Sequence, residues 1–378
     1  MYHVKTMNKI SKIGLAELDD RFAISDTMEH EDAILVRSAK LHDYDFPAEL
    51  KCIARAGAGV NNIPLDRAAD AGIVVFNAPG ANANGVKELT IAALLLASRK
   101  ISQGITWVKE QSAAGADVAA VVEKGKSAYV GPEILGKTLG VVGLGAIGVL
   151  VANAAAALGM KIVGYDPFLS VTHALNLTPG VEVVDTLPEL YAKADYISLH
   201  LPMNDATRGT LNEAAFAAMK DGVRIVNLAR GELVDTPAMK AALASGKCAA
   251  YVTDFPNSET AAIEGVVAIP HLGASTPESE DNCAMMAARE IKEYLDNGSI
   301  INSVNLPNLT MAWAAKTRVC VISKGADAAA IAGAVPAVAS ASNTRGEYAY
   351  TILDTDAAVD EAAIAAIPGV LRVRVLTR

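Results

Sequence analysis

Three polar side chains in the second half of the chain have the chemistry of an alcohol-oxidising site. They are Arg230, Glu259 and His271. A histidine can take the proton of a hydroxyl group and return it to a carbonyl near neutral pH, and a neighbouring carboxylate raises its pKa. An arginine fork holds a substrate carboxylate in a fixed plane. The three residues therefore suffice for hydride exchange between a 2-hydroxy acid and a 2-oxo acid, if a hydride carrier binds beside them.

A glycine-rich loop indicates what that carrier is. Gly143, Gly145 and Gly148 form a GxGxxG sequence that follows an apolar run and opens an alanine-rich span. In this context the first glycine allows a tight turn, the second lets the backbone approach a pyrophosphate, and the third lets helix and strand pack closely. Asp166 ends the next predicted strand, where a carboxylate accepts both ribose hydroxyls of NAD and repels the 2′-phosphate of NADP. NAD is therefore the predicted cofactor, and no metal site is predicted.

The segment 93–278 is predicted to be one doubly wound parallel sheet. Arg230 and Asp254 each follow a predicted strand, at the edge where such sheets bind ligands. The span 103–131 interrupts the order with helix-like, poorly patterned sequence and is predicted to be an arm for dimer contact. Helix-like spans separate six short apolar runs, which are predicted as strands at 139–143, 161–165, 181–184, 196–201, 224–228 and 249–253.

The flanking segments predict two further units. One long helix is expected over 277–297, because acidic residues occupy its first turn and Asn-Gly closes it. The fold class is therefore α/β, with two doubly wound, Rossmann-like parallel-sheet domains and a small C-terminal βαββαβ module of the ferredoxin-like type. Outside 93–278 the expected strands are 33–37, 52–56, 73–77, 318–323, 337–342, 347–353 and 370–376, and the shorter helices are 64–71, 327–335 and 358–367.

Composition narrows the function classes. The formal charge is −9 and no Lys/Arg block occurs, which argues against a nucleic-acid partner. The four cysteines are widely spaced and the N-terminus has no apolar signal-peptide core, so a reducing, cytoplasmic location is expected. The apolar stretch 138–160 is about long enough to cross a bilayer. Its three glycines and its β-branched beginning instead favour a buried strand followed by a helix, with no membrane partner.

With these motifs in order, the chain resembles the D-isomer-specific 2-hydroxyacid dehydrogenase family over roughly residues 30–310. The resemblance implies a discontinuous substrate-binding domain at 1–92 and 279–312, an NAD-binding domain at 93–278, and an ACT-like regulatory domain at 317–378. The segments that carry it are VRSAK (36–40), RAGAGVNNI (55–63), VVGLGAIG (141–148), GYDP (164–167), NLARGELVD (227–235), TDFPNSE (253–259) and PHLGAST (270–276).

The resemblance also implies roles for single residues. Arg230 orients the substrate, His271 is the acid–base group and Glu259 is its partner. Arg37 and Arg55 are candidate phosphate ligands, and the backbone N–H groups of Ala58, Gly59 and Val60 could hold the substrate carboxylate as a small anion nest. The positions that fall where the family contacts NAD are Gly143, Gly145, Ala146, Ile147, Gly148, Asp166, Leu201, Leu228, Ala229, Asp254 and Gly273.

The activity that the resemblance implies is oxidation of D-3-phosphoglycerate to 3-phosphooxypyruvate with NAD, the first step of L-serine biosynthesis. The expected partners are a phosphorylated 2-hydroxy acid and further copies of the chain, as a homodimer or homotetramer. A reductase for glyoxylate, hydroxypyruvate or another 2-oxo acid is the enzyme alternative, and an NAD-sensing corepressor is the alternative of another class.

Two departures from the family pattern stand out. Glu259 and His271 are closer in sequence than is usual for the family, and the site can still close if 266–269 is the intervening strand. The first strand–helix loop of the C-terminal module, SKGAD at 323–327, lacks the His and Asn expected for serine binding.

Overall fold

The computed structural model describes all 378 residues, and its internal contacts divide the chain into two compact units. Unit 1 comprises Met1–Asn82 and Pro277–Arg378, and unit 2 comprises Ala83–Thr276. The chain therefore leaves unit 1 after Asn82, about ten residues earlier than the sequence-based boundary at 92. The reason is helix α3 (Ala83–Ser98), whose residues Val86, Ala93 and Leu94 are buried in the core of unit 2.

Unit 2 contains a seven-stranded parallel sheet in the order β12-β11-β10-β9-β6-β7-β8. This is the doubly wound arrangement, with the reversal of strand order between β6 and β9. It confirms the six predicted strands, and β12 corresponds to the intervening strand considered at 266–269. The strands are β6 (Thr138–Val142), β7 (Lys161–Tyr165), β8 (Glu182–Val183), β9 (Tyr196–Leu199), β10 (Val223–Asn227), β11 (Cys248–Thr253) and β12 (Val266–Ala268).

The strand register brings five loops to one edge of this sheet. Val142 pairs with Leu199, Leu199 with Asn227, Asn227 with Thr253, and Thr253 with Ala268. Because all these strands are parallel and end level with one another, the segments that follow them emerge side by side. The edge therefore collects the glycine loop and the segments that contain Arg230, Asp254 and His271.

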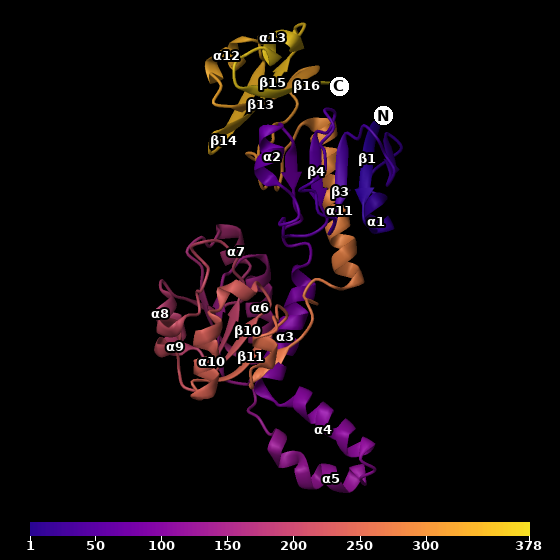
Figure 1. Cartoon of the computed structure of the whole chain (residues 1–378). Coiled ribbons are helices and arrows are strands. Elements are labelled where there is room, and N and C mark those ends of the chain that lie inside the picture. Colours follow the sequence, from indigo (N-terminus) through magenta and orange to yellow (C-terminus); the bar gives the residue numbers. More distant parts are fainter. The chain divides into compact units, whose positions relative to one another are not determined.

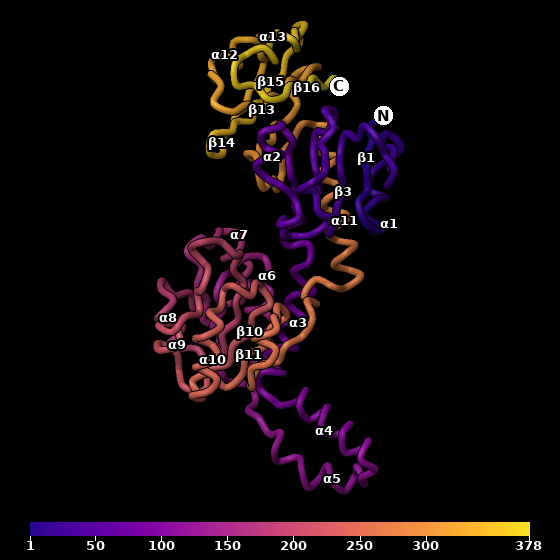
Figure 2. The backbone as a smooth tube through the Cα atoms, in the orientation of Figure 1, coloured from indigo at the N-terminus to yellow at the C-terminus, as the bar shows by residue number.

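Helices cover this sheet and a separate arm extends from it. The arm is a helical hairpin of α4 (Ile101–Ala113) and α5 (Val118–Gly125), followed by the 3-10 turn η1 (Lys126–Tyr129), and it has no buried residue. Figures 1 and 2 show it projecting from the rest of unit 2.

No helix is both long and apolar enough to span a membrane. The covering helices are α6 (Ala146–Ala157), α7 (Val171–Leu175), α8 (Leu187–Lys193), α9 (Glu213–Ala218) and α10 (Thr236–Ala244).

Unit 1 is built on a five-stranded parallel sheet in the order β2-β1-β3-β4-β5. Three of its strands were predicted. β1 was not, because polar residues interrupt its apolar ones, and β2 was not, because its apolar run is only three residues long. Helix α11 occupies the predicted residues Pro277–Asn297 and buries its apolar side against this sheet. The elements are β1 (Tyr2–Met7), β2 (Phe22–Ser25), β3 (Ala33–Val36), β4 (Cys52–Arg55), β5 (Val74–Phe76), α1 (Lys12–Leu15) and α2 (Leu65–Asp70).

The C-terminal segment has the predicted βαββαβ order and forms a four-stranded antiparallel sheet, β14-β15-β13-β16. This module is not separate from unit 1. Cys320, Ile322 and Tyr350 share one apolar core with Tyr294 and Leu295 of α11. Its elements are β13 (Thr317–Lys324), α12 (Ala328–Gly333), β14 (Ala339–Arg345), β15 (Tyr348–Thr355), α13 (Glu361–Ala365) and β16 (Val370–Thr377).

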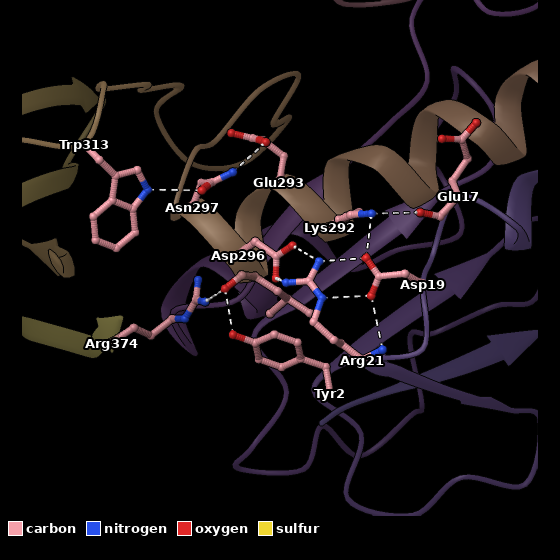
Figure 3. A network of polar contacts seen from close by, with 11 residues as sticks. Tyr2, Glu17, Asp19, Arg21, Lys292, Glu293, Asp296, Asn297, Trp313 and Arg374 are labelled. Atoms are coloured by element: carbon pink, nitrogen blue, oxygen red, sulfur yellow. Dashed lines mark hydrogen bonds and ion pairs between the residues drawn. The ribbon is translucent and has the colours of Figure 1, made fainter. Parts of the chain in front are cut away.

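Polar bonds at the end of α11 complete this junction. Arg374 of β16 donates to the carbonyl oxygens of Tyr294 at 3.0 Å and Leu295 at 2.9 Å, and the Tyr2 hydroxyl also donates to Leu295 (Figure 3). The last carbonyls of a helix lack partners within the helix and carry partial negative charge, so a guanidinium is a favourable cap. The C-terminal module thus closes the end of α11.

Candidate active site

The glycine loop between β6 and α6 is shaped by contacts that differ at each glycine. Gly143 has a φ of +94°, and a Cβ there would lie 2.6 Å from the carbonyl oxygen of His200. A Cβ at Gly148 would overlap the carbonyl oxygen of Gly143, whereas one at Gly145 would meet nothing within 4 Å. The first and third glycines are therefore required by the fold. The second leaves open space at the amino end of α6, as a bound pyrophosphate requires.

Asp166 lies directly after β7 and stabilises the glycine loop through hydrogen bonds to the backbone. One carboxylate oxygen accepts the backbone N–H of Leu144 at 2.9 Å, and the other accepts that of Phe168 at 2.8 Å. Each carboxylate oxygen can accept a second hydrogen bond. The half-buried side chain can therefore hold the loop and still receive ribose hydroxyls.

Neighbouring predicted cofactor residues surround the same loop. Ala146 and Ile147 begin α6, where the backbone N–H groups of a first helical turn have no partner within the helix. A methyl carbon of Leu201 lies 3.2 Å from the Cβ position of Gly143. His200 packs on the loop through its backbone, and burial lowers the pKa of its ring to about 4, so it is neutral near pH 7. We therefore regard His200 as a structural histidine.

Arg230 is held at the end of β10 by a residue that the sequence analysis did not single out. Buried Asn227 donates to the carbonyl oxygen of Arg230 at 2.8 Å and accepts the N–H of Ala229 at 3.2 Å. Asn227 therefore fixes the turn that contains Leu228, Ala229 and Arg230. The Arg230 guanidinium donates only to the adjacent Ala229 carbonyl, so most of its five N–H donors are available to a ligand.

Asp254 follows β11 and is 1% exposed. One of its carboxylate oxygens accepts the N–H of Gly273 at 3.2 Å, and the other is buried without a partner. Burial raises the pKa of Asp254, while the Gly273 N–H and the charges of His271 and Arg230 act in the opposite direction. A buried, unpartnered acceptor beside this edge of the sheet is a ready hydrogen-bond site for a cofactor amide.

Phe255 links the two residues expected to act on substrate. Its ring centroid lies 4.3 Å from that of His271, and the guanidinium carbon of Arg230 lies 5.5 Å from the centre of the same ring. The structure therefore brings Arg230, Asp254 and His271 together around one aromatic side chain. Phe255 was quoted within TDFPNSE but given no role, because nothing in the motif shows which way its ring points.

The structure does not bring Glu259 to His271. Both side chains are exposed, and no hydrogen bond or ion pair joins them. Reciprocal hydrogen bonds between Asn257 and Thr260 fix the turn that contains Glu259. Glu259 directly precedes the 3-10 turn η3 (Thr260–Ala262). His271 instead follows β12, which is the strand that the short spacing required.

A separate group of predicted residues lies in unit 1, after strands β3 and β4. The Arg55 Nε donates to the carbonyl oxygen of Arg37 at 3.0 Å, which places the two arginines side by side. The backbone N–H groups of Ala58, Gly59 and Val60 make no hydrogen bond within the chain, while Asn77 anchors the Ala58 carbonyl at 2.6 Å. This loop offers the backbone donors and cations that an anion needs.

Comparison with known proteins now decides the family. Residues 91–273 match the model of the D-isomer specific 2-hydroxyacid dehydrogenase, NAD binding domain. Residues 91–273 belong to this family. The family match confirms NAD as the cofactor of this dehydrogenase domain, and it falls within unit 2, where the glycine loop and the Arg230 and His271 segments lie.

Curated relatives that match most of this chain give further context. A D-3-phosphoglycerate dehydrogenase of Methanocaldococcus jannaschii is 35% identical over 315 residues, covering 81% of this chain and 58% of that one. The chain spans about half the length of the curated relatives it matches.

Two solved structures resemble this dehydrogenase fold. A glyoxylate reductase from Paecilomyes thermophila is 28% identical with a TM-score of 0.66 and covers 80% of this chain and 98% of its own. An NAD+-bound 3-phosphoglycerate dehydrogenase of Entamoeba histolytica is 26% identical with a TM-score of 0.62, and covers 82% and 99%.

Proposed function

We propose that the chain oxidises D-3-phosphoglycerate to 3-phosphooxypyruvate with NAD, the entry to L-serine biosynthesis. The observation that supports this most is the grouping of Arg230, Asp254 and His271 around Phe255, at the sheet edge that also carries the glycine loop. The names of the relatives supply the substrate, and the two arginines after β3 and β4 suit its phosphate.

The proposed chemistry assigns one task to each residue. NAD held by the glycine loop and Asp166 would supply the acceptor for the hydride that leaves C2 of the hydroxy acid. The imidazole of His271 takes the hydroxyl proton, and in the reverse direction returns it to the carbonyl oxygen. Arg230 holds the substrate carboxylate in plane, and Asp254 offers its unpartnered oxygen to the carboxamide of the nicotinamide. Glu259 becomes the partner of His271 only if the turn at 257–260 carries it toward that ring.

The wider organisation follows from the same proposal. We assign dinucleotide binding to unit 2 and substrate binding to the parallel-sheet part of unit 1. The module at 317–378 is proposed to be ACT-like, because its strand order and antiparallel pairing are those of the ferredoxin-like βαββαβ type. The uncovered α4–α5 arm is proposed as the contact surface with a second copy of the chain.

The role of His271 has a direct test. The His271→Ala variant should lose about 10²–10⁴-fold in kcat for 3-phosphooxypyruvate reduction, because the proton donor is missing. NADH binding, followed by its fluorescence, should be unchanged. His42→Ala removes an exposed histidine outside the site and serves as the control. Near-normal turnover in His271→Ala would remove His271 from the mechanism.

A second candidate is reduction of a smaller 2-oxo acid, favoured by the likeness to a glyoxylate reductase structure. Fold and catalytic groups do not separate the two substrates. The ratio of kcat/KM for 3-phosphooxypyruvate to that for hydroxypyruvate and glyoxylate decides between them. NADH binding without oxidation of any of these acids would instead support the NAD-sensing class.

A further inference from the structure

Glu280 engages one of the two arginines that follow β3 and β4. The Arg37 guanidinium donates to the Glu280 carboxylate at 2.6 Å. The two side chains are 41% and 43% exposed. Arg37 comes directly after β3, whereas Glu280 lies in the first turn of α11. The pair therefore ties a strand-end cation to a helix more than two hundred residues away in sequence.

The same turn of α11 lies close to both arginines. Burial raises the pKa of the Cys283 thiol to about 11, while Arg55 and Arg37 act to lower it and Glu280 acts to raise it. Two cations and one anion thus act on a single buried atom on α11. The backbone N–H groups at 58–60 follow Arg55 in the chain and are unbonded.

An anionic substrate group that binds Arg37 must compete with Glu280 for it. Exposed ion pairs contribute only about 0–1 kcal/mol, so displacement is easy. The displaced carboxylate nevertheless stays near the incoming anion and repels it, most strongly when the anion is doubly charged, as a phosphate monoester is.

We propose that Glu280 is a specificity-determining residue that competes for Arg37 and so sets the affinity for substrates with an anionic tail. This inference rests on the proposed function. Removing the charge of Glu280 should favour phosphorylated over unphosphorylated 2-oxo acids. The effect should shrink as ionic strength rises, because the groups involved are partly exposed.

A simpler reading is that Glu280 only stabilises α11, since acidic side chains are favourable at a helix amino end. The chain offers a matched control for this reading. Glu278 carries the same charge in the same turn, is exposed, and forms no ion pair or hydrogen bond with Arg37, whose carboxylate partner is Glu280. Glu278→Gln therefore removes the same helix-end charge without releasing Arg37.

The test measures the ratio of KM for 3-phosphooxypyruvate to KM for hydroxypyruvate in the unaltered chain, Glu280→Gln and Glu278→Gln. Glu280→Gln should lower this ratio about three- to tenfold, and Glu278→Gln should change it less than about twofold. Equal ratios in all three proteins, or equal changes in the two variants, would overturn the proposal.

A second readout separates this inference from the proposed activity. Inorganic phosphate, titrated calorimetrically into the full chain, should bind Glu280→Gln more tightly than the unaltered chain and Arg37→Met more weakly. This holds even if no 2-oxo acid is reduced, in which case only the proposed function fails. Phosphate binding that is undetectable, or unaffected by either substitution, would contradict the role of Glu280.

Discussion

The ligand edge of the unit 2 sheet and the junction between α11 and the C-terminal module use the same residue types in opposite ways. At the junction, Arg318 and Asp354 are both fully buried and form two hydrogen bonds, at 2.7 and 2.9 Å. At the sheet edge, Arg230 bonds only to its neighbour's carbonyl and Asp254 keeps a buried oxygen unpartnered.

The number of hydrogen bonds that a charged side chain already makes distinguishes residues that stabilise the fold from residues that can bind a ligand. A buried charge is tolerated when it is paired and hydrogen-bonded, as Arg318 and Asp354 are at the junction. Groups that await a ligand must remain incompletely bonded, which is the state of the sheet edge. Arginine, aspartate and aromatic residues are therefore informative about function only together with the number of partners they already have.

The largest effect should come from breaking the junction. Arg318→Met leaves Asp354 charged and buried without its partner, which typically costs about 3–5 kcal/mol. The free energy of unfolding, measured by denaturant titration of the full chain, should fall by that amount. Asp221→Asn removes a surface ion pair with Lys247 and should cost less than about 1 kcal/mol. Similar small losses in both variants would abolish the contrast between the two regions.

Glu290 of α11 is an incompletely hydrogen-bonded acid that lies outside the proposed ligand site. One oxygen accepts from Asn302 at 2.7 Å, the other is buried without a partner, and burial raises the pKa of this carboxyl to about 8 from 4.5. Below about pH 4.5 it is protonated whether the chain is folded or not. Between 4.5 and 8 only the unfolded chain ionises, so the stability due to the neutral acid is lost as pH rises.

The free energy of unfolding of Glu290→Gln, relative to that of the unaltered chain, should therefore be higher at pH 8 than at pH 5. The expected increase is on the order of 3 kcal/mol. The glutamine cannot ionise and keeps an acceptor for Asn302. Unfolding free energies of both proteins at the two pH values provide the measurement. A difference between the proteins that does not depend on pH would show that Glu290 is not a buried neutral acid.

The smallest effect distinguishes two glycines on the ligand side. Gly145→Ala meets no protein atom, so stability should be unchanged while the Kd for NADH rises about tenfold or more, through contact with the pyrophosphate. Gly148→Ala overlaps the Gly143 carbonyl and should lower the melting temperature as well. Unchanged NADH affinity in Gly145→Ala would place the dinucleotide elsewhere.

The sequence predicts most of the strands because apolar runs and glycines have clear local signatures. It missed β1, in which polar and apolar residues are mixed, and β2, a four-residue strand at the edge of the sheet. Arg230 and Asp254 could be placed from predicted strand ends, whereas the role of His271 came from the family resemblance. The roles of Asn227 and Phe255, and the separation of Glu259 from His271, depend on turn geometry that no spacing rule specifies.

The pairing of Arg37 with Glu280 could not be predicted either, because the packing of α11 brings together two residues that are far apart in sequence. Likewise, βαββαβ order could be predicted for 317–378, but not that its core would merge with that of unit 1. That merger depends on which side of each strand faces α11.

Transfer of the hydride from NADH to the 2-oxo acid is the most direct test of the proposed function. NADH deuterated at both C4 positions is incubated with the full chain and 3-phosphooxypyruvate, and the product is examined by mass spectrometry and NMR. If the proposed function is correct, one deuterium appears at C2 of D-3-phosphoglycerate. Product without deuterium, or NADH that binds but is never oxidised by any 2-oxo acid, would contradict it.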